Sequence, residues 1–301
     1  MSGSPPPAAL LQSAAMRIWM ARGLVLGILA VAAYGFWQGT PQDVVNAVRS
    51  GNVDGLKAAL RKDPASVHTK VYAQAFETQT ARTNHRMRTG KDPWDGRYLV
   101  HDAVEITFEA LPILDALAAG GADLAVRLRG QTLLHLAAAK GDLEVATWLL
   151  DHGADLHAVN DCDDGCAERG YTPLHSGLDF RDDEMTVLLL ARGARLEAAG
   201  ADGRTALHKA AFRGKLSGAF VLARHGADLT RTDTAGKTPP DLAGVRLPGA
   251  EITDAELATF KQWFAPGGKF ATVSAMARAS GAPMSDDAAR EVFATLDSAT
   301  K

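Results

Sequence analysis

The sequence has few cysteines, and it contains none of the common catalytic motifs. Two cysteines among 301 residues exclude a small scaffold held by many disulfides. The patterns of serine hydrolases, P-loop proteins, zinc proteases and dinucleotide-binding folds are missing, so we predict no enzyme, no cofactor and no small-molecule substrate. An excess of positive charge is also missing. The 32 Lys and Arg residues are balanced by 35 Asp and Glu residues, which argues against a nucleic-acid partner.

Acidic residues are absent from the first 40 positions, where Arg17 and Arg22 are the only charges. Residues 1–16 are small, polar and proline-rich, and we expect a disordered tail there. Residues 18–37 form an apolar run in which Arg22 is the only charge. A helix of that length reaches about 30 Å, which matches a bilayer core. We therefore predict a single transmembrane helix within residues 17–38, through which the chain contacts the membrane.

Trp19 lies near one end of the apolar run, and Tyr34 and Trp37 lie near the other, as is typical of membrane interfaces. A cleaved signal sequence is the main alternative, with Ala-Val-Ala at 30–32 as its cleavage site. Both readings place the N-terminus in the cytoplasm and the remaining chain outside it. The Ala-, Gly- and Arg-rich composition suggests a bacterium, in which the outer compartment is the periplasm. We expect a single-pass anchored protein, or a secreted one if the segment is cleaved.

A four-residue element recurs after the apolar run and ends each time in a histidine. The copies are Tyr98-Leu99-Val100-His101, Thr132-Leu133-Leu134-His135, Thr172-Pro173-Leu174-His175 and Thr205-Ala206-Leu207-His208, followed by the degenerate Thr238-Pro239-Pro240-Asp241. The steps between their last positions are 34, 40, 33 and 33 residues. A Gly-Ala pair follows each histidine by 18 to 20 residues. Two markers in phase indicate a tandem repeat.

Each repeat has the pattern of two short antiparallel helices. Residues 133–141 form a small-residue helix that ends at a glycine, the usual helix stop. Residues 142–153 begin with Asp142 as N-cap and carry one apolar stripe. Neither helix alone can bury its apolar side. Stacked neighbours can, so the repeats predict a solenoid with one continuous core.

These residues resemble the ankyrin-repeat family, whose pattern of Thr-Pro-Leu-His, a Gly-closed first helix and Gly-Ala-Asp is nearly complete in residues 130–161. The resemblance covers residues 41–245 and begins with a divergent repeat at 43–67. It implies an all-α solenoid of helix-turn-helix units with short β-hairpin fingers. It also implies that the repeated histidines bond to the backbone of the neighbouring turn. A shared metal site is excluded, because successive repeats lie about 10 Å apart.

The unit that starts at Thr172 departs from the family pattern. It has Arg181 in place of the inter-helix glycine, Asp183 in place of a leucine and Arg195 in place of the final aspartate. We expect this unit to be locally the weakest. Two insertions also interrupt the repeats, at residues 68–97 and 160–169.

Residues 246–301 leave the repeat pattern. Residues 253–256 form a capping box before an apolar helix, and further helices are expected over 270–279 and from Ser285 onward. Because the end of a solenoid needs a polar outer face, we expect a C-terminal helical cap. A separate functional module, including an enzyme site in these helices, is the alternative.

Cys162 and Cys166 both lie in the 160–169 insertion. An exported loop favours a disulfide between them. Free thiols and metal binding with His152 or His157 are the alternatives, although a second cysteine pair for a zinc site is missing. A redox- or metal-responsive protein that uses this pair is accordingly a second candidate function.

The family resemblance implies that a protein partner binds the concave face built from turn tips and first helices. We predict a non-enzymatic interaction module that binds through this face and the 68–97 loop. Arginine and aromatic residues are favoured at such contacts. For Phe180 and Phe212 the alternative is that the ring packs under a neighbouring finger. The candidate contact residues are Arg86, Arg88, Trp94, Ile106, Lys140, Phe180, Phe212 and Arg213.

Overall fold

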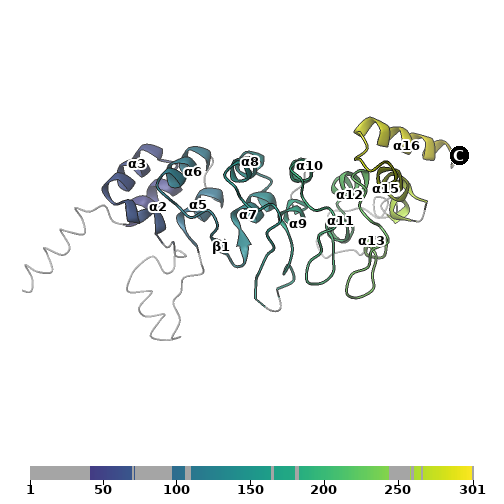
Figure 1. Cartoon of the computed structure of the whole chain (residues 1–301), viewed down its shortest axis with the longest axis horizontal. Coiled ribbons are helices and arrows are strands. Elements are labelled where there is room, and N and C mark those ends of the chain that lie inside the picture. Colours follow the sequence, from purple (N-terminus) through teal and green to yellow (C-terminus); the bar gives the residue numbers. More distant parts are fainter. Residues whose placement is uncertain are drawn as a thin grey trace, which may run out of the picture.

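The structure, a computed structural model, describes residues 41–69, 71, 97–105, 110–163, 166–179, 183–243, 258, 261–265 and 267–299. Most of the helices in these ranges form pairs that follow one another in a single elongated row (Figure 1). The pairs are α2 (Pro41–Arg49) with α3 (Val53–Lys62), α5 (Leu99–Glu105) with α6 (Ala110–Ala119), α7 (Leu133–Lys140) with α8 (Leu143–Asp151), α9 (Pro173–Gly177) with α10 (Glu184–Ala191), and α11 (Ala206–Arg213) with α12 (Leu216–Arg224). A 3-10 turn, η1 (Pro64–His68), follows α3, and the short helix α13 (Pro239–Leu242) follows α12. The predicted helical repeat architecture is confirmed.

The pair α7–α8 shows why the repeat sequence forms two helices. The Thr132 side chain caps α7 by accepting a hydrogen bond from the backbone N–H of His135. Gly141 ends α7 in the left-handed region, with φ of 74°. The Asp142 carboxylate then accepts the N–H of Val145 at 3.0 Å and begins α8. Both boundaries lie where the sequence predicts them, because each depends on a local cap.

Small residues let neighbouring first helices approach closely. The second residue after each repeated histidine is small and buried, as Ala103, Ala137, Gly177 and Ala210 show. Gly177 also faces α10, the second helix of its own pair. A Cβ atom there would lie only 3.0 Å from the Met185 side chain, so alanine would crowd the core. The core is continuous along the row. Its fully buried aliphatic residues include Leu99, Ile113, Leu117, Leu133, Leu134, Leu149, Leu174, Leu189, Leu207 and Leu222.

Fingers project from the row between successive helix pairs (Figure 1). The first is a hairpin of β1 (Arg127–Leu128) and β2 (Gln131–Thr132), and its turn has both Arg129 and Gly130 at positive φ. Neighbouring fingers are joined by backbone hydrogen bonds. The N–H of Asp161 donates to Gly130 at 3.2 Å, and the N–H of Ala201 donates to Arg169 at 2.8 Å. The fingers therefore form a continuous layer.

The unit starting at Thr172 differs from its neighbours. Its first helix, α9, is a five-residue helix, and Asp183 makes no side-chain cap at the start of α10. Arg181 lies outside the described residues. The short helix agrees with the departure from the family pattern, and the lower local stability of this unit stays a prediction.

Beyond the repeats, the described residues include the helices α15 (Lys269–Ser280) and α16 (Asp286–Ala299), and residues 261–264 are also helical. α15 packs against α12, and the Ser274 hydroxyl donates to the Ala227 carbonyl at 2.5 Å. Ser285 caps α16 by accepting the N–H of Ala288 at 3.2 Å, at the predicted helix start. The predicted capping box at 253–256 lies outside the described residues.

The predicted transmembrane segment 18–37 also lies outside the described residues, as do most of the 68–97 insertion and the tail at 1–16. Among the helices that the structure describes, none is both long enough and apolar enough to cross a bilayer.

Candidate functional site

The first helices and the fingers share one side of the row (Figure 1). We call this surface the finger face; it comprises α5, α7, α9 and α11 together with the fingers at 127–132, 159–171, 199–205 and 231–238. It corresponds to the face that the sequence predicts to bind a partner.

Buried histidines connect the first helices to the fingers. His135 Nε2 lies 2.9 Å from the carbonyl oxygen of Tyr171, and its Nδ1 accepts the backbone N–H of Thr132 at 3.2 Å. His175 and His208 contact the carbonyls of Arg204 and Lys237 in the same way, at 3.2 and 3.1 Å. The role implied by the resemblance is confirmed for these three. His101 differs, because its Nε2 has no hydrogen-bond partner among the described residues.

Burial holds these histidines neutral. It lowers the pKa of His135 to about 4 and the pKa of His175 to about 3, because a buried imidazolium loses its hydration. Burial also lowers the pKa of His101 to about 4, and the positive charge of Arg97 lowers it further. The finger layer is thus attached through neutral imidazoles.

We expect the folded chain to lose stability as the pH falls from 6.5 towards 4. In that range the unfolded chain binds protons at His135 and His175, with ordinary pKa values near 6.5, while the folded chain does not. Each histidine then contributes up to about 1.4 kcal/mol per pH unit, and stability rises with pH. Urea unfolding at pH 7, 6 and 5 measures this slope. His135→Gln should make the slope shallower, whereas His152→Gln, at an exposed position, should not.

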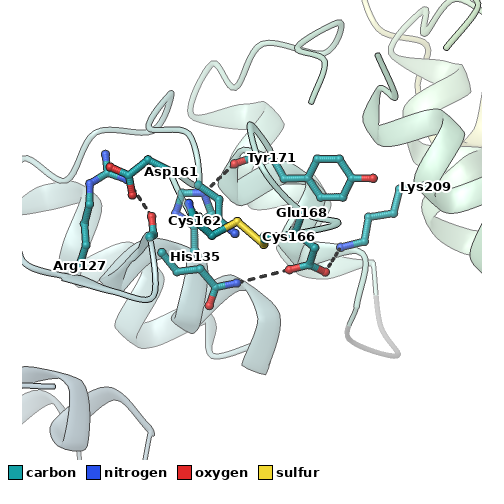
Figure 2. The surroundings of a disulfide bond; sticks show 11 residues. Arg127, His135, Asp161, Cys162, Cys166, Glu168, Tyr171 and Lys209 are labelled. Carbon is teal, nitrogen blue, oxygen red and sulfur yellow. Dashed lines mark hydrogen bonds and ion pairs between the residues drawn. A yellow bond between two sulfur atoms is a disulfide. The ribbon is translucent and has the colours of Figure 1, made fainter. Parts of the chain in front are cut away.

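Cys162 and Cys166 form a disulfide in the 159–171 finger, with their Cα atoms 6.0 Å apart (Figure 2). This is one of the three states that the sequence left open. The buried Asn160 closes the base of the finger, since its N–H donates to Tyr171 and its carbonyl accepts the N–H of Gly170, both at 2.7 Å. Gly130 is required opposite, because a Cβ there would lie 2.2 Å from the backbone nitrogen of Cys162.

The disulfide finger contacts α11 through a buried lysine (Figure 2). Lys209 is only 4% exposed, and its Nζ lies 2.8 Å from the Asp179 carboxylate and 3.6 Å from Glu168. It also lies 5.3 Å from the centre of the Tyr171 ring. Arg213 reaches the other Asp179 oxygen at 3.5 Å. We call Glu168, Asp179, Lys209 and Arg213 the Lys209 cluster.

Three of the predicted contact residues are described. Lys140 is exposed, and its Nζ donates to the Val104 carbonyl at 3.0 Å. Arg213 is exposed at the end of α11. Phe212 is half-buried rather than exposed, because it packs against the core while the Arg204 guanidinium lies 5.1 Å from its ring centre. Arg86, Arg88, Trp94, Ile106 and Phe180 lie outside the described residues.

Sequence reasoning missed Lys209, Asp179 and Glu168. A signal for Lys209 was available: it directly follows the repeated histidine and stands between Leu207 and the alanines at 210 and 211. A lysine among the small apolar residues of a first helix indicates a buried charge that needs a carboxylate partner.

The sequence matches known ankyrin repeats over most of the row. Residues 100–199 match the family described as "Ankyrin repeats (3 copies)", and residues 202–234 match "Ankyrin repeat". The chain is 36% identical over 128 residues to the B-cell lymphoma 3 protein homolog of Mus musculus. That match covers 42% of this chain and 27% of the relative. It is 31% identical over 123 residues to the NF-kappa-B inhibitor cactus of Drosophila melanogaster. That match covers 40% of this chain and 22% of the relative.

A third relative is the transient receptor potential cation channel subfamily A member 1 homolog of Caenorhabditis elegans, 37% identical over 114 residues. That match covers 38% of this chain and 9% of the channel, so the chain spans about a quarter or less of these relatives. The solved ankyrin repeat domain of Bcl-3 is 28% identical, with a TM-score of 0.47 over 67% of this chain and 93% of that one. On the family matches and the capped helix pairs, residues 100–199 and 202–234 of this chain are ankyrin repeats.

Proposed function

We propose that this chain is a non-enzymatic interaction module that binds a protein partner through the finger face. The observation that carries the proposal is that one half-buried ring and two arginines, one partly buried and one exposed, meet on this face. The Phe212 ring packs beneath Arg204, with Arg213 next to it in sequence and exposed. Arginine and aromatic side chains of this kind commonly dominate binding energy at interfaces.

The rigidity of the finger face supports the same proposal. The fingers are joined to one another by backbone hydrogen bonds and to the helices by the histidines. A surface that is already ordered loses little conformational entropy when a partner binds. The relatives that match include the NF-kappa-B inhibitor cactus. The partner of this chain need not be the partner of that relative, because binding depends on the residues of the finger face and not on the fold.

We further propose that residues 18–37 tether the module to a membrane and that the repeats lie outside the cytoplasm. The length of the apolar run and the arginines before and within it support this placement. The disulfide in the 159–171 finger also supports an oxidising compartment.

In-cell photo-crosslinking tests the binding face. We expect a photoreactive residue at Arg213 to capture a discrete partner. The same residue at Glu144, which is exposed in the first turn of α8, should capture none. The partner captured at Arg213 is then titrated against purified chains. Phe212→Ala combined with Arg213→Ala should weaken its binding by at least about 10-fold, because hot-spot truncations commonly cost 2 kcal/mol or more.

Capture at Glu144 equal to that at Arg213, or full binding by the double variant, would refute the proposed face. The disulfide supports a second candidate, a redox-responsive protein. The same titration with Cys162→Ser separates the two: binding that depends on the disulfide favours redox control, while unchanged binding favours a constitutive interaction module.

A further inference from the structure

A groove with an aromatic floor lies between α12 and α16, next to the end of α11. Its volume is about 540 Å³, within the range of small-molecule sites. Phe220 of α12, Trp263 and Phe293 of α16 line it. Leu216, which is 36% exposed, adds apolar surface at the start of α12. The groove therefore offers a ligand an apolar surface made of three rings and one aliphatic side chain.

The aromatic floor is held in place from below. The rings of Phe220 and Phe293 meet edge to face with centres 5.2 Å apart, and Trp263 lies 5.4 Å from Phe293. Trp263 also packs edge to face on Phe270, which is fully buried. Because these rings fix one another, the groove is formed before any ligand enters.

The two charged residues that line the groove are both positive. Arg290 and Lys215 line the groove, and Lys269 Nζ lies 4.8 Å from the Trp263 ring centre and 5.2 Å from that of Phe293. Arg290 is exposed and has no ion-pair partner within the described part of the chain. The acidic residues within one turn of it on α16 are Asp286, which pairs with Arg224, and Asp287 and Glu291; none of the three lines the groove. An apolar ligand with a negative end thus complements the groove.

We propose that this groove binds a small amphipathic carboxylate. Its apolar chain would lie on the rings of Phe220, Trp263 and Phe293, and its carboxylate would pair with Arg290. The planar guanidinium suits this role, since it can donate two parallel hydrogen bonds to a carboxylate. This site shares no lining residue with the finger face and does not depend on the proposed partner.

Calorimetric titration of the full chain with decanoate tests the proposal, and decyltrimethylammonium provides an apolar chain of the same length with the opposite charge. We expect saturable binding of one decanoate per chain. The cation should bind at least about 10-fold more weakly, because it cannot accept the charged hydrogen bond from Arg290. Equal binding of the two ions, or no saturable binding of decanoate, overturns the proposal.

Three variants locate the bound decanoate. Arg290→Gln should weaken binding at least about 10-fold. Lys57→Gln makes the same change in net charge at an exposed position on α3, far from the groove, and binding should stay within about two-fold. Ser217→Trp places a ring inside the groove and should abolish binding. Circular dichroism checks that each variant is folded. If Arg290→Gln or Ser217→Trp binds decanoate as the original chain does, the ligand does not lie in this groove as proposed and the proposal is wrong.

Discussion

Asp179→Ala should destabilise the repeats by about 2 to 4 kcal/mol, because it leaves Lys209 charged in a buried position without its nearest carboxylate. Lys209 is 4% exposed and lies 2.8 Å from Asp179. Glu168, at 3.6 Å, compensates only in part. Removing one member of a buried pair commonly costs 3 to 5 kcal/mol, and the partial exposure of Asp179 places our value towards the lower end. Urea unfolding followed by circular dichroism measures the change.

Asp151→Ala is the matched control. Asp151 pairs with Arg192 at 2.9 Å, nearly the same distance, but the Asp151 side chain is 59% exposed. An exposed pair contributes at most about 1 kcal/mol, so this variant should remain close to the original stability. Lys209→Met combined with Asp179→Ala should recover most of the loss, since an apolar side chain then fills the site. Equal losses for Asp179→Ala and Asp151→Ala would contradict the argument.

The repeats could be predicted from the sequence because their signals are local. A Thr cap, a histidine three residues later and a glycine stop lie within ten residues of one another, as in Thr132, His135 and Gly141. The same holds for Asp142 at the start of α8 and Ser285 at the start of α16. Each of these boundaries depends on one or two hydrogen bonds that neighbouring residues make.

The Lys209 cluster could not be predicted, because its members meet only when the fold is complete. Glu168 comes from a finger, Asp179 follows α9 and Lys209 lies on α11. Lys209 is 41 residues after Glu168 in the sequence. Phe212 was ambiguous for the same reason: its half-burial depends on Arg204, which reaches its ring from the preceding finger. The spacing of such residues along the sequence predicts which face of the repeats they share. It does not predict which residues they contact there.

Phe270→Ala should cost about 3 to 5 kcal/mol at the C-terminal end of the solenoid, the range for truncating a buried phenylalanine. Phe270 is fully buried between Phe264 and Trp263, whose ring centres lie 4.9 and 5.5 Å away. It lies in the first turn of α15, which packs against α12. Because each solenoid unit contacts only its neighbours, the loss should be local. Hydrogen exchange should show α12 and α15 losing protection while α7 and α8 keep theirs.

Met276→Ala is the control on the same helix, since Met276 is 48% exposed and its truncation should leave protection unchanged. The contrast between the two variants decides what α15 and α16 do. If they cap the solenoid, Phe270→Ala must expose α12, because the Ser274–Ala227 and Arg278–Asp228 contacts that join α15 to the segment after α12 depend on α15 staying in place. If they form a separate module, Phe270→Ala unfolds α15 alone and α12 keeps its protection. That second outcome would refute the cap.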